Sequence, residues 1–161
     1  MVRPAQAADA AAIAAIYNFY VANTVVTFEE DPVSADEMRR RMDDVFASSL
    51  PWLAAEIDGR VVGYAYATKW KARSAYRYSV ETTVYIENGL AKQGVGTELY
   101  VELFRLLKER GMHAVIGGIA LPNDASVALH EKFGMRQVAH FPQVGFKFGQ
   151  WVDVGYWQLT L

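Results

Sequence analysis

The sequence of 161 residues contains no cysteine. This absence excludes a disulfide scaffold, a thiolate zinc site, a cysteine nucleophile and redox-active thiols. The sequence also lacks any stretch near the roughly 18 uninterrupted apolar residues of a membrane span, and Asp9 stands where a secretory signal needs an apolar block. We therefore expect a cytoplasmic protein without a membrane anchor.

An excess of charge of one sign is missing as well. Sixteen basic and eighteen acidic side chains leave a net charge of −2, which argues against a nucleic-acid or anionic-membrane partner. There is no Pro/Gly/Ser-rich linker, repeat or long charge run, and hydrophobic residues make up 52% of the chain. These features predict a single domain over residues 1–161 with a sizeable core.

Periodic apolar residues predict the helices. From Asp9 onward apolar side chains recur at intervals of three and four, and the Asp9 carboxylate is placed to accept hydrogen bonds from the first free N–H groups. Ser34 and Glu37 have the spacing of a capping box, so a second helix is expected to begin there. Two more helices are predicted, one from the Gly94-Val95-Gly96 turn to Gly111 and a shorter one from Pro122-Asn123 to Gly134.

Alternating β-prone residues predict the strands. Trp52–Ile57 and Val61–Thr68 are joined by Asp58-Gly59, the strongest short signal for an antiparallel hairpin. The next strand, Ser79–Ile86, carries Glu81 on one of its faces. A strand–loop–helix–strand unit over residues 80–120 adds parallel pairing, so a mixed sheet with helices on its faces is expected. Further strands are predicted at 114–120 and in the tail 137–161, around a loop at Gly145 and Gly149.

The turn before the third helix can hold a phosphate group. Successive backbone N–H groups converge there at the positive end of a helix, and Gly94 and Gly96 let a ligand approach the backbone. The same glycines would equally serve only to make a tight turn. A P-loop is absent, and Leu99 occupies the third-glycine position of a dinucleotide-binding motif. Phosphate binding stays open, whereas these motifs for ATP and NAD are excluded.

Three segments carry a resemblance to a known family: Tyr78–Ile86, the turn Gln93-Gly94-Val95-Gly96, and Leu121–Ser126 with His130–Gly134. Together they resemble the GNAT acetyltransferases, and more narrowly the phosphinothricin N-acetyltransferases. The resemblance extends through Thr27-Phe28, Trp70–Arg73 with Tyr76, and the tail from Gly145 to Trp157. It implies the GNAT fold, an α/β (α+β) architecture with a mixed central β-sheet of six to seven strands and about four helices on its faces.

The resemblance also implies acetyl-CoA as the acyl donor. In that family the strand before the glycine turn pairs with the pantetheine arm, and the turn binds the pyrophosphate. Ala91 departs from the usual Gln or Arg, so we expect weaker but not lost CoA binding. Asn123 matches the residue that touches the pantetheine end, although a helix N-cap explains it equally well. The implied cofactor-binding residues are Val84, Tyr85, Ile86, Lys92, Gln93, Gly94, Val95, Gly96, Thr97, Asn123 and Ser126.

Glu81 is the candidate general base. Acetyl transfer needs a neutral amine, and a free amine is mostly protonated at neutral pH, so some group must accept a proton. Burial of Glu81 in its β-prone strand would raise its pKa toward a useful range. Taken alone, a strand glutamate usually faces solvent. The resemblance, in which this glutamate is the proposed base, favours catalysis.

The histidines His113, His130 and His140 have no metal-ligand spacing, so we expect no metal site. His130 lies one helical turn after Ser126 and shares that residue's helix face near the proposed cofactor. The ordinary interpretation is a half-buried histidine without a chemical role. Because the phosphinothricin group carries histidine here, the resemblance implies a secondary catalytic role for His130, as an acid or auxiliary base.

A pair of basic residues could bind an anion. Lys71 and Arg73 are two positions apart and could share one face, although a solvated basic loop is the ordinary interpretation. Through the resemblance they become substrate-binding residues, and the acceptor is then small, anionic and presents a primary amine to Glu81. The other implied substrate-binding residues are Phe28, Tyr76, Thr83 and Tyr85.

The predicted reaction is direct acetyl transfer from acetyl-CoA to the α-amine of L-phosphinothricin or methionine sulfoximine, a herbicide- or antibiotic-resistance type of activity. The alternatives are acetylation of another amine, such as another amino acid, a polyamine, an aminoglycoside or a protein N-terminus, and a non-catalytic acetyl-CoA-binding module. Lys71 and Arg73 argue against a polycationic acceptor, and the presence of Glu81 argues against the module. The resemblance also suggests a homodimer.

Overall fold

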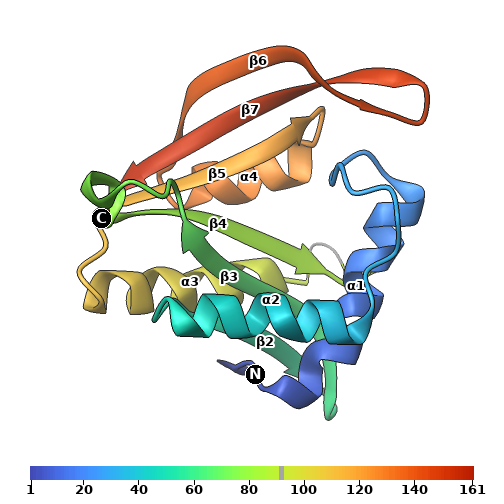
Figure 1. Cartoon of the computed structure of the whole chain (residues 1–161), viewed down its shortest axis with the longest axis vertical. Coiled ribbons are helices and arrows are strands. Elements are labelled where there is room, and N and C mark those ends of the chain that lie inside the picture. Colours follow the sequence, from blue (N-terminus) through green and yellow to red (C-terminus); the bar gives the residue numbers. More distant parts are fainter. Residues whose placement is uncertain (91–92) are drawn as a thin grey trace.

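The computed structural model describes residues 1–90 and 93–161. Within these residues seven strands form one sheet in the order β1-β2-β3-β4-β5-β7-β6 (Figure 1). The strands are β1 (Val2–Pro4), β2 (Trp52–Ile57), β3 (Arg60–Lys69), β4 (Ser79–Ile86), β5 (Ala114–Leu121), β6 (Arg136–Lys147) and β7 (Gln150–Thr160). The helices are α1 (Ala10–Asn23), α2 (Ala35–Ala47), α3 (Val95–Glu109) and α4 (Asp124–Lys132). The expected mixed β-sheet of six to seven strands with about four helices on its faces is confirmed.

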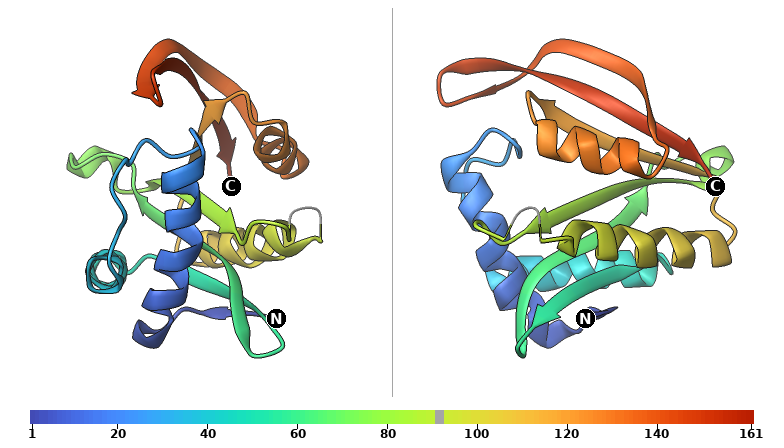
Figure 2. Two further views of the ribbon diagram at one scale, coloured as in Figure 1. Left: turned by 90° about the vertical axis from the view of Figure 1, so that its right-hand side faces the viewer. Right: turned by 180° about the vertical axis from the view of Figure 1, so that it is seen from behind.

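Helices cover both faces of the sheet. Helices α1 and α2 lie on one face and α3 and α4 on the other (Figure 2). The apolar face of α3 points inward, because Leu99, Leu103 and Leu107 are all 0% exposed. Burial of each such leucine stabilises the fold by about 2 kcal/mol. The core fills both sides of strands β2 to β4, against α3 on one face and against α1 and α2 on the other.

Several local predictions are confirmed. Ser34 caps α2, since its hydroxyl accepts a hydrogen bond from the Glu37 N–H at 3.1 Å. Asp58 and Gly59 have φ values of 49° and 76°, as the β2–β3 hairpin turn requires. Strands β4 and β5 pair in parallel, with Glu81 opposite Ile116. These elements follow from short-range sequence signals.

Two local predictions are wrong. Asp9 does not cap α1: residues Ala7–Asp9 form a short 3-10 turn, and the carboxylate accepts from the Gln6 N–H at 2.7 Å and pairs with Arg3 at 2.8 Å. Gly145 is not in the tail loop but within β6, and the turn to β7 lies at Phe148 and Gly149. In both cases a contact outside the expected element, with Arg3 or with Phe28, decides the outcome.

Strands β4 and β5 separate to form a fork. They pair only from Ser79 to Glu81, opposite Ala114 to Ile116. Beyond that point β5 stays paired with β7 along its whole length, whereas β4 stays with β3 (Figure 1). The edge of β4 between Thr82 and Ile86 therefore faces the fork without a strand partner from β5.

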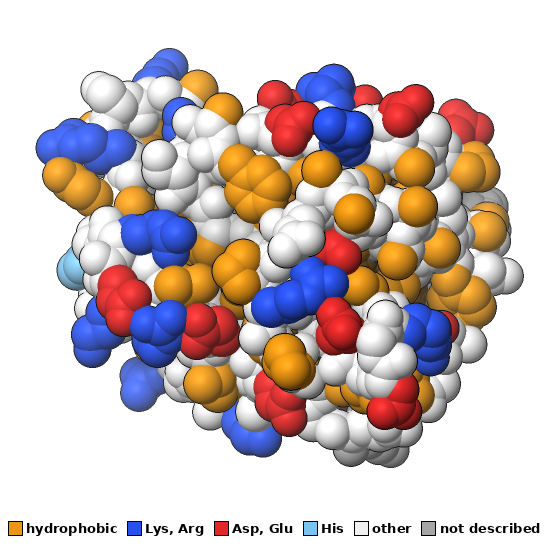
Figure 3. Space-filling model, turned by 90° about the horizontal axis from the view of Figure 1, so that it is seen from below, with side chains coloured by type: hydrophobic (Ala, Val, Ile, Leu, Met, Phe, Trp, Pro, Cys, Tyr) orange, Lys and Arg blue, Asp and Glu red, His pale blue; other side chains and the backbone are white. Residues whose placement is uncertain are grey.

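Acidic and basic side chains are interspersed over the face of the molecule shown in Figure 3. No helix in residues 1–90 and 93–161 is long and apolar enough to cross a membrane.

Candidate active site

The free edge of β4 can bind an extended ligand. The Glu87 N–H donates to the Val62 carbonyl at 2.8 Å, so backbone groups of odd-numbered β4 residues point toward β3. Those of Val84 and Ile86 therefore point into the fork, and the Ile86 carbonyl accepts from the Tyr20 hydroxyl at 2.5 Å. The Tyr85 backbone faces β3, opposite Tyr64. Of the three strand residues implied to contact the cofactor, the geometry thus favours Val84 and Ile86.

The start of α3 offers a cradle for a phosphate group. Gly94 has a φ of 84° and occupies the N-cap position, where no side chain accepts from the first turn. The N–H groups of Val95, Gly96 and Thr97 thus remain at the positive end of the helix dipole. A Cβ on Gly96 would lie 3.2 Å from Leu129, so glycine lets α3 approach α4 closely. This arrangement fits the pyrophosphate of acetyl-CoA.

The predicted cradle also included Lys92 and Gln93. Lys92 lies outside the described residues, as does the departure from the family pattern at Ala91, whereas Gln93 is exposed beside the turn. Lys132 of α4 donates from Nζ to Thr97 Oγ1 at 3.2 Å, which brings an ammonium group to the start of α3. No pattern in the sequence indicates Lys132, because its proximity to Thr97 depends on the packing of α4 against α3.

Asn123 and Ser126 lie on the other arm of the fork, where β5 ends and α4 begins. Asn123 Oδ1 accepts from the Ser126 N–H at 3.1 Å, so the N-cap interpretation of Asn123 is confirmed. The contact of these two residues with the cofactor stays a prediction.

Glu81 lies at the base of the fork as the last β4 residue that pairs with β5. Its half-buried carboxylate and the Tyr156 ring converge over Gly118, where an added Cβ would lie 3.3 Å from Glu81 Oε1 and 3.0 Å from Tyr156. Burial raises the pKa of Glu81, and the nearby positive charge of Lys71 opposes this rise. No described protein group donates a hydrogen bond to the carboxylate. Glu81 is therefore a stronger proton acceptor than an exposed glutamate.

Thr83 and Tyr85 share the sheet face of Glu81, beneath the segment that joins α1 to α2. The Tyr85 ring meets the Tyr17 ring edge-on at 5.3 Å, and the Tyr17 hydroxyl is 2.7 Å from Thr27 Oγ1. Next to Thr27, Phe28 remains 40% exposed. These contacts make a partly aromatic surface next to Glu81.

The basic pair is only partly brought to this surface. Lys71 Nζ lies 4.8 Å above the Trp70 ring, and its charge acts on Glu81. Arg73 is exposed ahead of the short turn Ser74–Tyr76, and Tyr76 is 43% exposed. The structure thus brings Lys71 close to Glu81, while the substrate contacts of Arg73 and Tyr76 stay predictions.

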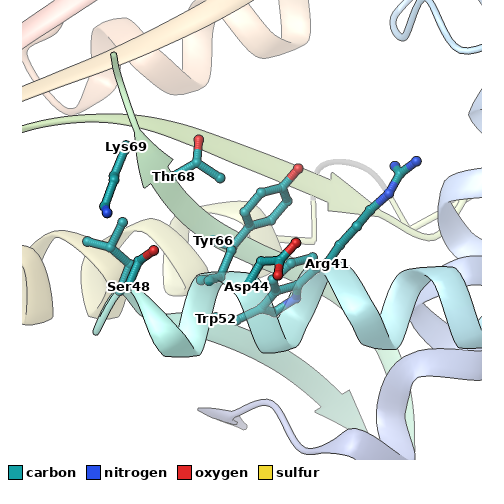
Figure 4. Close-up of a pocket in the computed structure, with 9 residues that line it drawn as sticks. Arg41, Asp44, Ser48, Trp52, Tyr66, Thr68 and Lys69 are labelled. Atoms are coloured by element: carbon teal, nitrogen blue, oxygen red, sulfur yellow. The ribbon is translucent and has the colours of Figure 1, made fainter. Parts of the chain in front are cut away.

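A groove of about 360 Å³ lies between α2 and β3 (Figure 4). It is lined by Tyr66 and Thr68, which pair directly with Thr83 and Glu81 across the strands. Tyr66 and Thr68 were not among the predicted site residues, although their alternation along β3 places them on one face. Beside the groove, the buried Trp52 Nε1 has no acceptor among the described residues, so one donor remains unused.

His130 is buried in the core beside the fork. Its side chain lies against Gly117, and the residue is only 3% exposed. Nδ1 is 2.7 Å from the Ser126 carbonyl, so it carries the proton and donates. Nε2 is then the acceptor for the Tyr100 hydroxyl at 3.1 Å. Burial lowers the pKa of His130, so the neutral ring is favoured. This geometry supplies a structural role, and the proton-transfer role stays a prediction.

Replacing His130 tests these two roles. The variant His130→Ala should lose about 3 kcal/mol of stability, because it opens a cavity and leaves the Tyr100 hydroxyl without a partner. Urea denaturation measures this loss, and kcat per folded molecule should change less than about tenfold. Tyr100→Phe is the matched control, which keeps the imidazole and removes its partner. Full stability together with a hundredfold lower kcat in His130→Ala would instead support proton transfer.

His130 should also make stability depend on pH. Its pKa is lower in the folded protein than in the unfolded chain. The stability from the neutral ring is therefore present above the unfolded-state pKa and is lost as pH falls through the folded-state pKa.

Across residues 1–90 and 93–161, no group of three His, Asp or Glu side chains is arranged to hold a metal ion.

Comparison with known proteins gives concordant matches. Residues 2–155 match the family described as an acetyltransferase (GNAT) domain. The chain is 42% identical over 159 residues to the phosphinothricin N-acetyltransferase of Streptomyces viridochromogenes, covering 98% of this chain and 85% of that protein. It is 35% identical over 160 residues to the L-methionine sulfoximine/L-methionine sulfone acetyltransferase of Salmonella typhimurium, covering 99% and 94% respectively.

A solved structure has the same fold. It is a GNAT-superfamily phosphinothricin acetyltransferase from Sinorhizobium meliloti in complex with acetyl-CoA, with a TM-score of 0.97 and 34% identity. The similarity covers 100% of this chain and 88% of that chain.

Proposed function

The chain belongs to the GNAT acetyltransferase family, and we propose that it acetylates the α-amine of a small anionic amino acid of the phosphinothricin or methionine sulfoximine type. One observation carries this proposal. The half-buried Glu81 carboxylate, with Lys71 near it, lies where β4 and β5 begin to separate. A proton acceptor, a cation and a free strand edge thus meet at one point.

Acetyl-CoA, when bound, supplies an acetyl thioester. The N–H groups at the start of α3, with Lys132 beside them, would hold its pyrophosphate. The Val84 and Ile86 backbone would hold its pantetheine arm by strand-like hydrogen bonds. The Val84 N–H would also stabilise the negative charge that develops on the acetyl oxygen when an amine attacks.

The acceptor would bind on the sheet face that carries α1 and α2, opposite the face that carries α3. Lys71 and Arg73 would pair with its carboxylate or phosphinate. Phe28, Tyr76 and Tyr85 would form the walls around its side chain. Glu81 would take the amine proton, directly or through water. Holding the amine next to the thioester would supply much of the rate by alignment alone. The groove along Tyr66 and Thr68 offers room for a longer acceptor side chain.

A homodimer is proposed as well. On the β6–β7 hairpin, exposed apolar side chains lie close together, among them Phe146 at 55% and Trp151 at 63% exposure. An apolar surface of this kind commonly marks a protein interface, and a second copy of the chain is our proposed occupant. Sedimentation analysis should give twice the chain mass, and a monomer would contradict the dimer.

The acceptor proposal is tested by thiol release from acetyl-CoA. The acceptors are L-phosphinothricin, L-methionine sulfoximine, ordinary amino acids and spermidine. The kcat/KM should be at least about tenfold higher for the two analogues than for spermidine, because spermidine has no anionic group for the exposed Lys71 and Arg73, and each such surface ion pair contributes up to about 1 kcal/mol. Preference for ordinary amino acids would move the assignment to a general amino acid acetyltransferase. Tight acetyl-CoA binding without release would indicate a binding module or a macromolecular acceptor.

A further inference from the structure

The β6–β7 hairpin contacts the segment 24–34, which joins α1 to α2 and carries Phe28. Lys147 of β6 donates from Nζ to the Thr27 carbonyl at 2.8 Å. The residue is only 1% exposed, which is unusual for a lysine. Lys147 therefore ties the end of the hairpin to the backbone immediately before Phe28.

Gly145 makes a second contact with the same segment. A Cβ at this position would lie 2.3 Å from Phe28 Cζ and within 2.8 Å of two further ring atoms. The Phe28 ring therefore packs directly on the Gly145 backbone, and no larger residue fits without displacing the ring. Gly145 has no positive φ, so this contact rather than backbone strain requires glycine.

Strand alternation separates the two faces of β6 at this end. Gly145 and Lys147 are buried against the segment, whereas their neighbours Val144, Phe146 and Phe148 are 55–60% exposed. The inner positions are thus specialised for the segment and take no part in the exposed apolar surface.

Thr27 is held from the other side as well. The Tyr17 hydroxyl lies 2.7 Å from Thr27 Oγ1, and Tyr17 in turn contacts Tyr85 on the Glu81 face of the sheet. Phe28 is thereby fixed between the hairpin and the sheet, with 40% of its surface still exposed. A short series of contacts thus leads from Lys147 through Thr27 and Tyr17 to the surface beside Glu81.

Burying the Lys147 ammonium costs free energy, and the need to fill this volume does not explain why the residue is a lysine. Burial lowers its pKa, and Glu30 and Glu29 oppose this by their negative charge. Methionine would fill a similar volume without that cost. What lysine adds is a directed hydrogen bond that fixes the Thr27 carbonyl, and hence the position of Phe28.

We propose that Lys147 and Gly145 are positioning residues for the acceptor, acting through Thr27 and Phe28. The inference rests on the proposed function, in which Phe28 bounds the acceptor site. Neither residue touches Glu81 or the start of α3. Their loss should therefore weaken acceptor binding while sparing the chemical step and acetyl-CoA binding.

Steady-state kinetics test this with the best acceptor of the panel. Lys147→Met and Gly145→Ala should each raise the acceptor KM at least tenfold, with kcat and the acetyl-CoA KM within twofold of the parent enzyme. Lys147→Arg should restore most of the lost affinity. Lys108→Met, at an exposed position in the last turn of α3, is the matched control and should leave all constants unchanged.

A double-mutant cycle with Phe28→Ala isolates the route. Once the ring is gone, Gly145→Ala should have no further effect on the acceptor KM, since nothing remains to be displaced. Additive effects of the two substitutions, an unchanged acceptor KM, or equal rises in KM for both substrates would overturn the proposal.

Hydrogen exchange provides a readout that does not need turnover. Lys147→Met should speed exchange of the segment 24–34 amides at least tenfold and leave those of α3 unchanged, whereas Lys108→Met should change neither. Unchanged exchange would overturn the positioning role. A parent enzyme without turnover on the panel, but with this exchange difference, would refute the proposed acceptor and keep the coupling of hairpin and segment.

Discussion

Glu81→Gln should lower kcat by about 10²–10⁴-fold, the usual contribution of a positioned general base. The amide has nearly the same shape as the carboxylate and cannot accept the amine proton. The substitution should also leave the fold intact, because no described group depends on the Glu81 carboxylate for a hydrogen bond. The measurement is kcat with saturating acetyl-CoA at neutral pH, together with a thermal unfolding curve.

The raised pKa of Glu81 determines in which direction kcat should change with pH. Burial raises the pKa of Glu81, and only the deprotonated form can act as a base. The parent kcat should therefore rise with pH through this raised pKa, and Glu81→Gln should lack that limb. The folded protein holds this proton more tightly than the unfolded chain. The contribution of Glu81 to stability is thus full below its unfolded-state pKa and is lost as pH rises through its folded-state pKa.

Two measurements separate a loss of catalysis in Glu81→Gln from a folding defect: the stability of this variant, and the kcat of a variant at a matched glutamate. At neutral pH the glutamine variant should be at least as stable as the parent, since it removes a half-buried charge. Glu87→Gln is the control: Glu87 follows β4 directly, and its carboxylate pairs with Arg60 at 2.6 Å on the surface. Its kcat should stay within twofold. Full turnover by Glu81→Gln would remove Glu81 from the mechanism.

Most of the fold could be predicted because its signals are short-range. The Asp58-Gly59 turn, the Ser34 cap and the alternation of β4 each depend on residues within one turn or strand. The wrong predictions concern contacts that reach beyond a single turn or strand. Asp9 pairs with Arg3, six positions earlier, because the 3-10 turn that contains Asp9 precedes α1, and Gly145 is required by Phe28, more than a hundred positions earlier. Neither contact follows from the periodicity or turn signals of the segment itself.

The site was predictable in its chemistry and less so in its geometry. The strand of Glu81 and the glycine turn follow from local patterns, and the resemblance supplied their roles. The point where β4 and β5 separate depends on the pairing of β5 with β7, which no local pattern indicates. Lys132 and the Tyr100 partner of His130 are likewise brought in by tertiary packing. The sequence identifies the candidate residues, but it does not show which of their atoms already form hydrogen bonds within the protein.

Gly94→Val should raise the acetyl-CoA KM at least about tenfold, the loss expected when one or two hydrogen bonds to a charged phosphate are misplaced. Gly94 has a φ of 84° with open space around it, so valine meets no clash but resists the left-handed backbone. The strain should turn the first N–H groups of α3 away from their present direction. The acceptor KM should change little, because the proposed acceptor site lies on the other sheet face.

The hairpin glycine Gly59 supplies the control for backbone strain. It has a φ of 76°, also with nothing within 4 Å of an added Cβ, and it lies in the β2–β3 turn. Gly59→Val and Gly94→Val should each lose about 1–2 kcal/mol of stability, measured by urea denaturation. Only Gly94→Val should also lose affinity for acetyl-CoA, measured by calorimetry. Equal stability losses with unchanged acetyl-CoA binding in both variants would show that the pyrophosphate is not held at the start of α3.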